Sequence, residues 1–307
     1  MTIFTKPELE LVKCNLCGAD STEYFFTIKG FKICKCRSCG LMYVNPRPKV
    51  GVLHEIYDAS YFSNKDNCFT NHYFGYYDYE KNETQIKDTF RPRLKMIEKM
   101  LGGCGKLLDI GCAMGFFLSV AKESGWQTYG TDISKEAVEM VEKDIADQVF
   151  CGTVEQAQFK DKSFDAITMW DVIEHLSDPI GTLRVVNRLM KKGGVLALVT
   201  PDAGSLAASV LRSKWPEFQR VEEHIYFFSK KTLAAMLEKN GFKVEYSQGA
   251  GRIFDIPSIL SELKIYNFKL FTGLSRLSRK LGLSHVKIYV KPGYKFAMYA
   301  KKVSDIL

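Results

Sequence analysis

The chain has 307 residues and an apolar fraction of 46%, enough to bury a substantial core, and it carries a formal charge of +8. Residues 1–13 mix charged and apolar side chains, which argues against a signal peptide, and no segment reaches the roughly 20 apolar residues of a membrane span. We therefore expect a cytoplasmic protein, in which paired cysteines bind metal instead of forming disulfides.

Composition divides the sequence into four predicted parts. A cysteine-rich region covers 1–48, an aromatic-rich linker or lid covers 49–90, an alternating strand and helix block covers 91–250, and a basic region covers 251–307.

The first region contains two C-x-x-C pairs separated by 18 residues, the spacing of a four-cysteine zinc site. A glycine follows each pair directly and permits the turn that folds thiolates around one ion. So short a segment buries too little apolar area to fold alone, whereas a structural zinc contributes on the order of 10 to 16 kcal/mol. The sequence predicts a small zinc ribbon with a closed, structural site made by Cys14, Cys17, Cys36 and Cys39.

The second region holds nine aromatic residues between Tyr57 and Tyr79. Two interpretations are open. The rings pack the ribbon and leading helices onto the main domain, or they form a lid whose tyrosines hold a sugar or aromatic acceptor.

In the third region, short apolar runs that end at glycine or a turn alternate with stretches at helical spacing. Regular alternation predicts an α/β fold, with a doubly wound, mainly parallel sheet and helices on both faces. We expect strands at 106–110, 127–132, 149–151, 164–170, 195–200, 242–246 and 294–301. We expect helices over 116–124, from the Ser134 cap with Val138, Val141 and Ile145 on one face, from Asp178-Pro179 to Gly193-Gly194, and from Ser229 to Asn240-Gly241.

The loop after the first of these strands, residues 109–115, is the main ligand-binding motif. Gly111 and Gly115 let the backbone turn tightly and approach a ligand, while Asp132 lies 21 residues beyond Gly111 and is placed to hold ribose hydroxyls. The spacing is G-x-x-x-G and not the G-x-G-x-x-G of dinucleotide sites. Asp109 suits the amino group of a methionyl moiety and not a phosphate.

These residues resemble motif I of the class I S-adenosylmethionine methyltransferases, and the resemblance extends to Ser163-Phe164-Asp165 and to the run 171–176. It implies a seven-stranded Rossmann-like fold with S-adenosylmethionine as cofactor. Ala113 is a departure, since the family commonly has glycine there. The resemblance implies that Asp109, Gly111 and Gly115 face the methionine, Asp132 the ribose, and Thr153 and Val154 the adenine, that Trp170 lines the pocket, and that Cys112, Ala113, Phe116, Ile133 and Asp171 complete the set.

Together with the ribbon, the motifs around residues 40–48 and 57–62 are similar to a bacterial group of methyltransferases of the 11, 12 and 23 types. Members of this group occur with cell-surface sugar and secondary-metabolite pathways. The resemblance therefore implies a small-molecule acceptor, a sugar or a related biosynthetic intermediate.

His175 and His224 are the candidate catalytic bases, expected on the acceptor side of the pocket. Asp171, Glu174 and His175 lie at i, i+3 and i+4, and would share a face if that stretch is helical. With His224 they could hold a metal, as in small-RNA 3′-end methyltransferases, and quinone O-methyltransferases carry a similar run. The run is also a common structural stretch, so both interpretations stay open.

Residues 252–302 hold eleven Lys or Arg against two acids. Four leucines at 270, 274, 277 and 281 predict an amphipathic helix. It either packs on the main domain with its cations in water, or its cations receive a nucleotide-linked or lipid-linked sugar or rest on an acidic membrane. An RNA acceptor is a less favoured alternative because the aromatic residues cluster away from the lysines, and a non-catalytic cofactor-binding module is a third.

Overall fold

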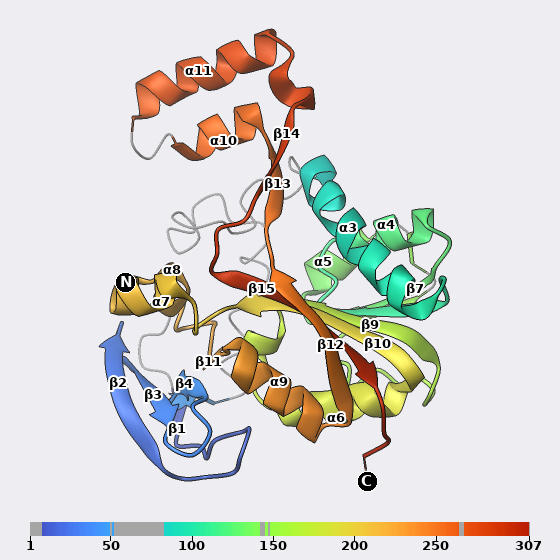
Figure 1. Cartoon of the computed structure of the whole chain (residues 1–307), viewed down its shortest axis with the longest axis vertical. Coiled ribbons are helices and arrows are strands. Elements are labelled where there is room, and N and C mark those ends of the chain that lie inside the picture. Colours follow the sequence, from blue (N-terminus) through green and yellow to red (C-terminus); the bar gives the residue numbers. More distant parts are fainter. Residues whose placement is uncertain are drawn as a thin grey trace.

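The computed structural model describes residues 8–49, 51, 83–141, 145–146, 148–263 and 267–306 (Figure 1). The aromatic segment 57–79 lies outside the described residues, and so do both interpretations of it. Within the described ranges, no helix is long and apolar enough to cross a membrane.

A seven-stranded sheet forms the centre of the molecule, in the order β12-β15-β10-β9-β6-β7-β8. β15 runs antiparallel to both of its neighbours, whereas the pairs from β10 to β8 are parallel. The prediction of a doubly wound, mainly parallel sheet is confirmed. Its strands are β6 (Lys106–Ile110), β7 (Gln127–Asp132), β8 (Gln148–Cys151), β9 (Phe164–Trp170), β10 (Met190–Pro201), β12 (Phe242–Gly249) and β15 (Lys295–Lys302).

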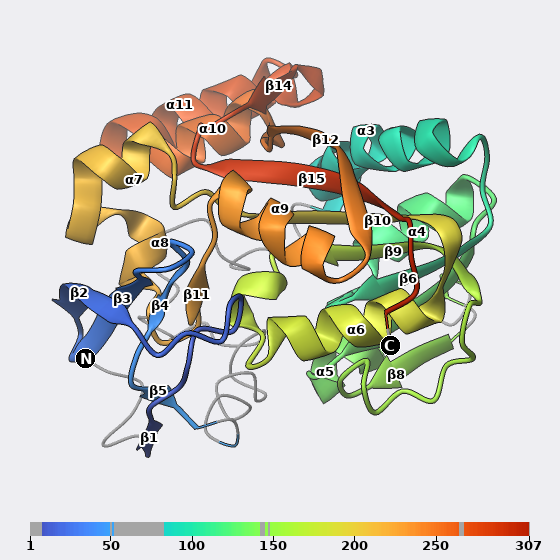
Figure 2. The same ribbon diagram turned by 60° about the horizontal axis from the view of Figure 1, so that its bottom comes forward.

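Helices cover both faces of this sheet, as Figure 2 shows for α3 (Glu83–Leu101) and α6 (Pro179–Leu189). Successive residues of a strand point to opposite faces. Leu107 accordingly packs in the core with α3 and α4 (Phe116–Glu123), and Leu108 packs in the core with α6 and α9 (Lys230–Lys239).

Two helix ends differ from the sequence prediction. The Ser134 side chain caps α5 as expected, but α5 (Lys135–Met140) stops where Val141 adopts an extended conformation, so Val141 and Ile145 do not belong to its face. α6 ends at Leu189 because Met190 is already extended and pairs with Phe164 of β9. The glycines at 193 and 194 therefore lie inside β10, at a register irregularity, and do not end the helix.

The ribbon is joined to the main domain through a shared sheet. Its strands β2 (Thr22–Ile28), β3 (Phe31–Cys36) and β4 (Met42–Val44) continue into β11 (Tyr226–Phe227), which belongs to the main domain. β1 (Leu9–Glu10) and β5 (Arg47–Pro48) form a separate pair. Arg47 donates to Ser177 O and Tyr226 Oη, and Asn15 bonds to Asp178 at 2.7 Å. The ribbon thus contacts the segments that follow β9 and β10.

Most of the basic region, from Arg252 to Val290, forms an arm that projects from the body, whereas β15 belongs to the central sheet (Figure 1). β13 (Arg252–Asp255) and β14 (Lys287–Val290) pair antiparallel and carry α10 (Ile256–Glu262) and α11 (Phe268–Lys280). The predicted helix is confirmed, but the interpretation in which it packs on the main domain is wrong. α11 buries Ser275 and Ser278 against α10, while four of its apolar side chains are between 37% and 69% exposed, namely Phe268, Leu270, Leu274 and Leu277.

Candidate active site

A cavity of about 210 Å³ lies beyond the carboxyl ends of β6 and β9. These strands are neighbours in the sheet but not in the chain, so the cavity occupies the point where strand order reverses, the usual ligand site of a doubly wound sheet. The N-terminal half of α3, the base of the β13–β14 arm and the start of β15 complete its walls.

The loop between β6 and α4 lines one side of this cavity and is held by backbone hydrogen bonds. Gly111 N and Cys112 N both donate to Thr131 O, at 2.7 and 3.0 Å. Gly111 has φ 73°, and a Cβ there would lie 2.5 Å from Val172 Cγ2, so the position requires glycine. Ala113 also has a positive φ, 47°. Glycine adopts such a conformation with less strain than alanine does, which explains why glycine is the more common residue at this turn.

Asp132 fixes the same loop from the end of β7. Its two carboxylate oxygens accept the backbone N–H of Ala113 at 2.8 Å and of Ser134 at 2.9 Å. Burial raises its pKa, while these hydrogen bonds lower it. Gly152 N donates to Asp132 O at 2.8 Å, which brings the loop after β8 beside it.

Asp109 is buried at the floor of the cavity. Its Oδ1 accepts a hydrogen bond from Thr168 Oγ1 at 2.6 Å, and burial raises its pKa to about 8. A buried carboxyl group of this kind is ionised when a cation lies beside it. The amino group of a methionyl moiety would supply that cation, so the loop fits the predicted cofactor.

Trp170 closes the other side of the floor. Its ring contacts Phe117 and Phe90, with centroids 5.1 and 5.9 Å apart, and the Arg93 guanidinium lies 5.3 Å from its centroid. Its buried Nε1 has no hydrogen-bond partner among the described residues.

The predicted site residues divide into two groups in the structure. Seven of them line the cavity: Asp109, Gly111, Cys112, Ala113, Trp170, Asp171 and His175. The others lie outside that lining: Gly115 and Phe116 at the start of α4, Asp132 and Ile133 at the end of β7, Thr153 and the buried Val154 after β8, and the buried His224.

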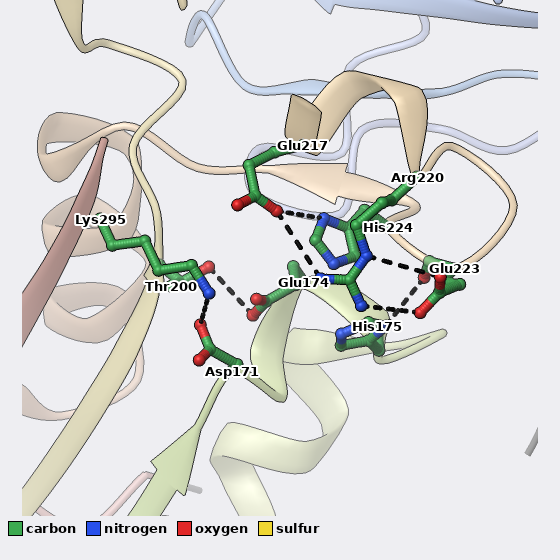
Figure 3. Close-up of polar contacts among 9 residues, drawn as sticks. All are labelled: Asp171, Glu174, His175, Thr200, Glu217, Arg220, Glu223, His224 and Lys295. Carbon is green, nitrogen blue, oxygen red and sulfur yellow. Dashed lines mark hydrogen bonds and ion pairs between the residues drawn. The ribbon is translucent and has the colours of Figure 1, made fainter. Parts of the chain in front are cut away.

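Asp171 forms an ion pair that sequence reasoning missed. Lys295 Nζ, from the start of β15, lies 2.9 Å from Asp171 Oδ1 (Figure 3). Burial alone would raise the pKa of Asp171, but Lys295, with Arg93 and Arg220, lowers it below its ordinary value, and the pKa of Lys295 is raised in turn. Asp171 therefore does not join Glu174 and His175 on one face, because its carboxylate is turned toward β15. No local pattern marks Lys295, which pairs with a residue 124 positions away.

Glu174, His175 and His224 lie together, with their potential ligand atoms all within 4.8 Å of one another (Figure 3). Glu174 and His175 belong to the short helix η2 (Ile173–His175), and His224 follows α8 (Pro216–Gln219). Burial raises the pKa of Glu174 to about 8, lowers that of His175 to about 4, and lowers that of His224 well below its ordinary value. Both imidazoles are neutral at physiological pH. His224 is 1% exposed and lies behind His175, so only His175 has the predicted position on the cavity wall.

The four ribbon cysteines also meet. Cys14 Sγ lies 3.5 Å from Cys39 Sγ, Cys17 Sγ lies 3.5 Å from Cys36 Sγ, and all four sulfurs are within 4.8 Å of one another. A tetrahedral zinc with bonds of about 2.3 Å separates its sulfurs by about 3.8 Å, so the cluster fits one ion. The two glycines that follow the pairs adopt φ 76° and 81° and donate to Cys14 O and Cys36 O, as the sequence predicts.

Comparison with known proteins agrees with this geometry. The family described as "Methyltransferase domain" matches residues 79–247. A ubiquinone biosynthesis O-methyltransferase of Xanthomonas oryzae pv. oryzae is 31% identical over 212 residues, which covers 65% of this chain and 82% of the relative. One from Pseudomonas aeruginosa is 29% identical over 132 residues, 41% of this chain and 57% of the relative, so the chain spans less than two thirds of that enzyme.

Among solved structures, the methyltransferase in complex with the Trm112 methyltransferase activator of Haloferax volcanii has a TM-score of 0.53 at 14% identity, covering 75% of this chain and 96% of that chain. This likeness concerns the fold. The family match, the sheet order and the loop after β6 lead to the same conclusion: the chain belongs to the methyltransferase domain family and is a class I S-adenosylmethionine-dependent methyltransferase.

Proposed function

We propose that this methyltransferase acts on a hydroxyl group of a small acceptor that carries an anionic group, a sugar or a related biosynthetic intermediate. The observation that carries the proposal is the number of cationic side chains around the cavity, two of which, Arg220 and Lys295, also pair with the acids Glu223 and Asp171. Arg93, Arg220, Arg252 and Lys295 line the cavity, against the two acids Asp109 and Asp171.

The walls of the cavity support an acceptor with both a flat face and a charge. Phe90, Phe254 and Val290 contribute apolar surface on which a ring can pack. Guanidinium and ammonium groups in a concave site favour phosphate or carboxylate ligands. The relatives named ubiquinone biosynthesis O-methyltransferase support oxygen as the methylated atom and a small molecule as its carrier.

In this proposal the loop residues 109–115, with Cys112, Ala113 and Phe116, hold the methionine part, Asp132 and Ile133 the ribose, and Thr153 and Val154 the adenine. The cofactor supplies a methyl group already activated by a sulfonium. The protein then mainly aligns the acceptor, which can contribute about 7 to 11 kcal/mol. We assign His175 to the proton of the acceptor hydroxyl, because its neutral imidazole faces the cavity. His224 positions His175, with ring centroids 4.6 Å apart.

The four ribbon cysteines in this proposal hold one structural zinc. The ion would close the ribbon, whose contacts at Ser177, Asp178 and Tyr226 support the segments on the acceptor side. We keep the predicted domain limits of 1–48, 49–90, 91–250 and 251–307 as a proposal, with β11 as a contribution of the main domain to the ribbon sheet.

We assign to the arm a peripheral contact with an anionic membrane. Residues 267–291 carry six Lys or Arg and no acid, and the exposed apolar face of α11 lies among these cations. Val290 and Pro292, at the base of the arm, line the cavity. A lipid-linked acceptor could therefore reach the cavity from the membrane side.

The test is incubation of the full chain with methyl-labelled S-adenosylmethionine and an extract of host small molecules. We expect a labelled product that binds to an anion exchanger and whose added mass is one methyl group. Label found only in RNA would promote the RNA alternative. Cofactor binding without any labelled product would favour the non-catalytic module.

A further inference from the structure

We propose that Glu174, His175 and His224 bind a divalent transition-metal ion at the acceptor wall, separate from the four thiolates of the ribbon. The three side chains offer one carboxylate oxygen and two imidazole nitrogens, all within 4.8 Å of one another.

Unpaired buried atoms at the centre of the cluster are the main evidence. Glu174 Oε1 and both ring nitrogens of His224 have no hydrogen-bond partner in the described part of the chain, although each residue is only 1% exposed. The nearest acid to His224 is Glu217, whose Oε2 lies 3.5 Å from Nδ1. Leaving such atoms unpaired in the interior costs about 1 to 3 kcal/mol for each group. One ion would satisfy a carboxylate oxygen and an imidazole nitrogen together.

The surrounding contacts hold the three ligands in place. Thr200 Oγ1 donates to Glu174 Oε2 at 3.0 Å, which leaves Oε1 for the ion. His175 Nδ1 lies 3.1 Å from Glu223 O, and a carbonyl oxygen only accepts, so Nδ1 carries the hydrogen and Nε2 the lone pair. Ile225 N donates to Glu174 O at 3.1 Å, which ties the segment of His224 to η2. Hydrogen bonds of this kind orient metal ligands in proteins.

Two imidazoles and one carboxylate favour zinc, iron, cobalt or nickel over magnesium or calcium. Three protein ligands leave a coordination position open. His175 lines the cavity, so we assign that position to the acceptor, whose hydroxyl the ion would bind and make more acidic. With its Nε2 lone pair on the ion, His175 would then act as a ligand and no longer as the base, and the proton of the hydroxyl would pass to solvent. This last step rests on the proposed function, whereas the metal site itself does not.

The experiment is a titration of the metal-depleted, reduced full chain with Co²⁺, without cofactor or acceptor. We expect two ions per chain, one with sulfur-to-metal charge-transfer absorption from the ribbon and one with only the weaker bands of nitrogen and oxygen ligands. His224→Ala should lose the second ion and keep the first. The matched control is His285→Ala, because His285 is exposed on η5 (Leu283–His285) of the arm.

If His224→Ala does not fold, Thr200→Val tests the same site from outside the ligand set. It should weaken the affinity for the second ion by roughly 10- to 100-fold, the usual effect of removing a hydrogen bond that orients a metal ligand. The circular dichroism spectrum should be unchanged. Binding of a single Co²⁺ with thiolate bands only, or a second ion that His224→Ala and Thr200→Val leave unchanged, would overturn the proposal. Because metal is counted without turnover, this result is independent of whether an acceptor is found.

Discussion

The two sides of the cavity are built in different ways. The cofactor side is one loop between adjacent elements, residues 109–115, fixed by backbone hydrogen bonds and by the carboxylate of Asp132. The wall that we assign to the acceptor takes charged side chains from segments far apart in the chain, among them Arg220, Lys295 and Asp171, although the resemblance placed Asp171 with the cofactor. A loop of this kind is specified locally and supports one chemistry, whereas the opposite wall can change its ligand by changing distant residues.

The ribbon metal offers the largest test of that difference, since structural zinc contributes on the order of 10 to 16 kcal/mol to folding. Cys14→Ser or Cys39→Ser should lose the one zinc that we propose for the ribbon and loosen the contacts at Ser177 and Tyr226. We expect turnover to fall by about 100-fold, the cost of misplacing a reacting group by about 1 Å. Metal analysis and acceptor kinetics measure both effects.

Cofactor affinity should be unchanged in these variants, because the hydrogen bonds described above between the ribbon and the main domain go to Ser177, Asp178 and Tyr226 and not to the loop after β6. Cys104→Ser is the matched control, since Cys104 is exposed and outside the cluster. An equal loss of cofactor binding would show that the two sides are not separable.

Asp132→Ala should have the opposite effect and weaken binding of the cofactor. It removes the acceptor for the backbone N–H groups of Ala113 and Ser134, at a cost of about 1 to 3 kcal/mol for each unpaired group. Calorimetry should show binding of S-adenosylmethionine and of its demethylated product weakened by roughly 10- to 100-fold. Asp161→Ala, at an exposed position, is the control. Unchanged affinity, or binding of NAD in place of S-adenosylmethionine, would contradict the assignment of the loop.

Lys295→Met should affect only the acceptor side. We expect kcat/KM for the anionic acceptor to fall by about 10-fold, the effect of losing roughly 1.4 kcal/mol of charge pairing, with cofactor affinity retained. Lys243→Met, at an exposed position of β12, is the control. A larger loss of cofactor affinity than of kcat/KM for the acceptor would mean that Lys295 belongs to the cofactor side of the cavity.

The same variant has a pH signature. Because Lys295 lowers the pKa of Asp171 below the ordinary 3.8, the ion pair stabilises the fold above that pH, and the contribution is lost as the pH falls through the lower, folded-state pKa. The difference in thermal stability between the wild type and Lys295→Met should therefore be full at neutral pH and shrink in acid. A difference that grows in acid would contradict the ion pair.

The sequence predicts the local features of this molecule and misses the tertiary ones. The strands, the turn at Gly111 and the paired cysteines follow from periodicity and spacing, which act over a few residues. The end of α6 at Leu189 does not follow from the local pattern. Met190 pairs with β9, so the helix ends before the glycines at 193 and 194. The partner of Asp171 and the burial of His224 depend on which distant segments the sheet brings together, and no local pattern encodes that.

The exposed face of α11 is a second case of this kind, because the spacing of the leucines predicts the helix but not whether they are buried. Leucines at helical spacing usually face a core, yet here Ser275 and Ser278 face α10 and the leucines face outward among Arg276, Arg279 and Lys280. An outward apolar stripe bordered by cations is typical of a helix that lies on an anionic membrane.

Arg276→Glu combined with Arg279→Glu should therefore weaken binding of the full chain to vesicles of anionic lipid. Each basic residue near such a surface contributes about 1 kcal/mol, so the double variant should lose at least about 10-fold in affinity at low salt. Its KM for a lipid-linked acceptor should rise, while cofactor affinity stays constant, because the described residues of the arm line the cavity at its base, on the side that we assign to the acceptor. Lys231→Glu with Lys243→Glu makes the same change in charge at exposed positions of the main domain and serves as the control. If the wild-type chain does not bind anionic vesicles, or if both double variants weaken binding equally, the arm has no specific role at the membrane. Its leucines would then need another partner.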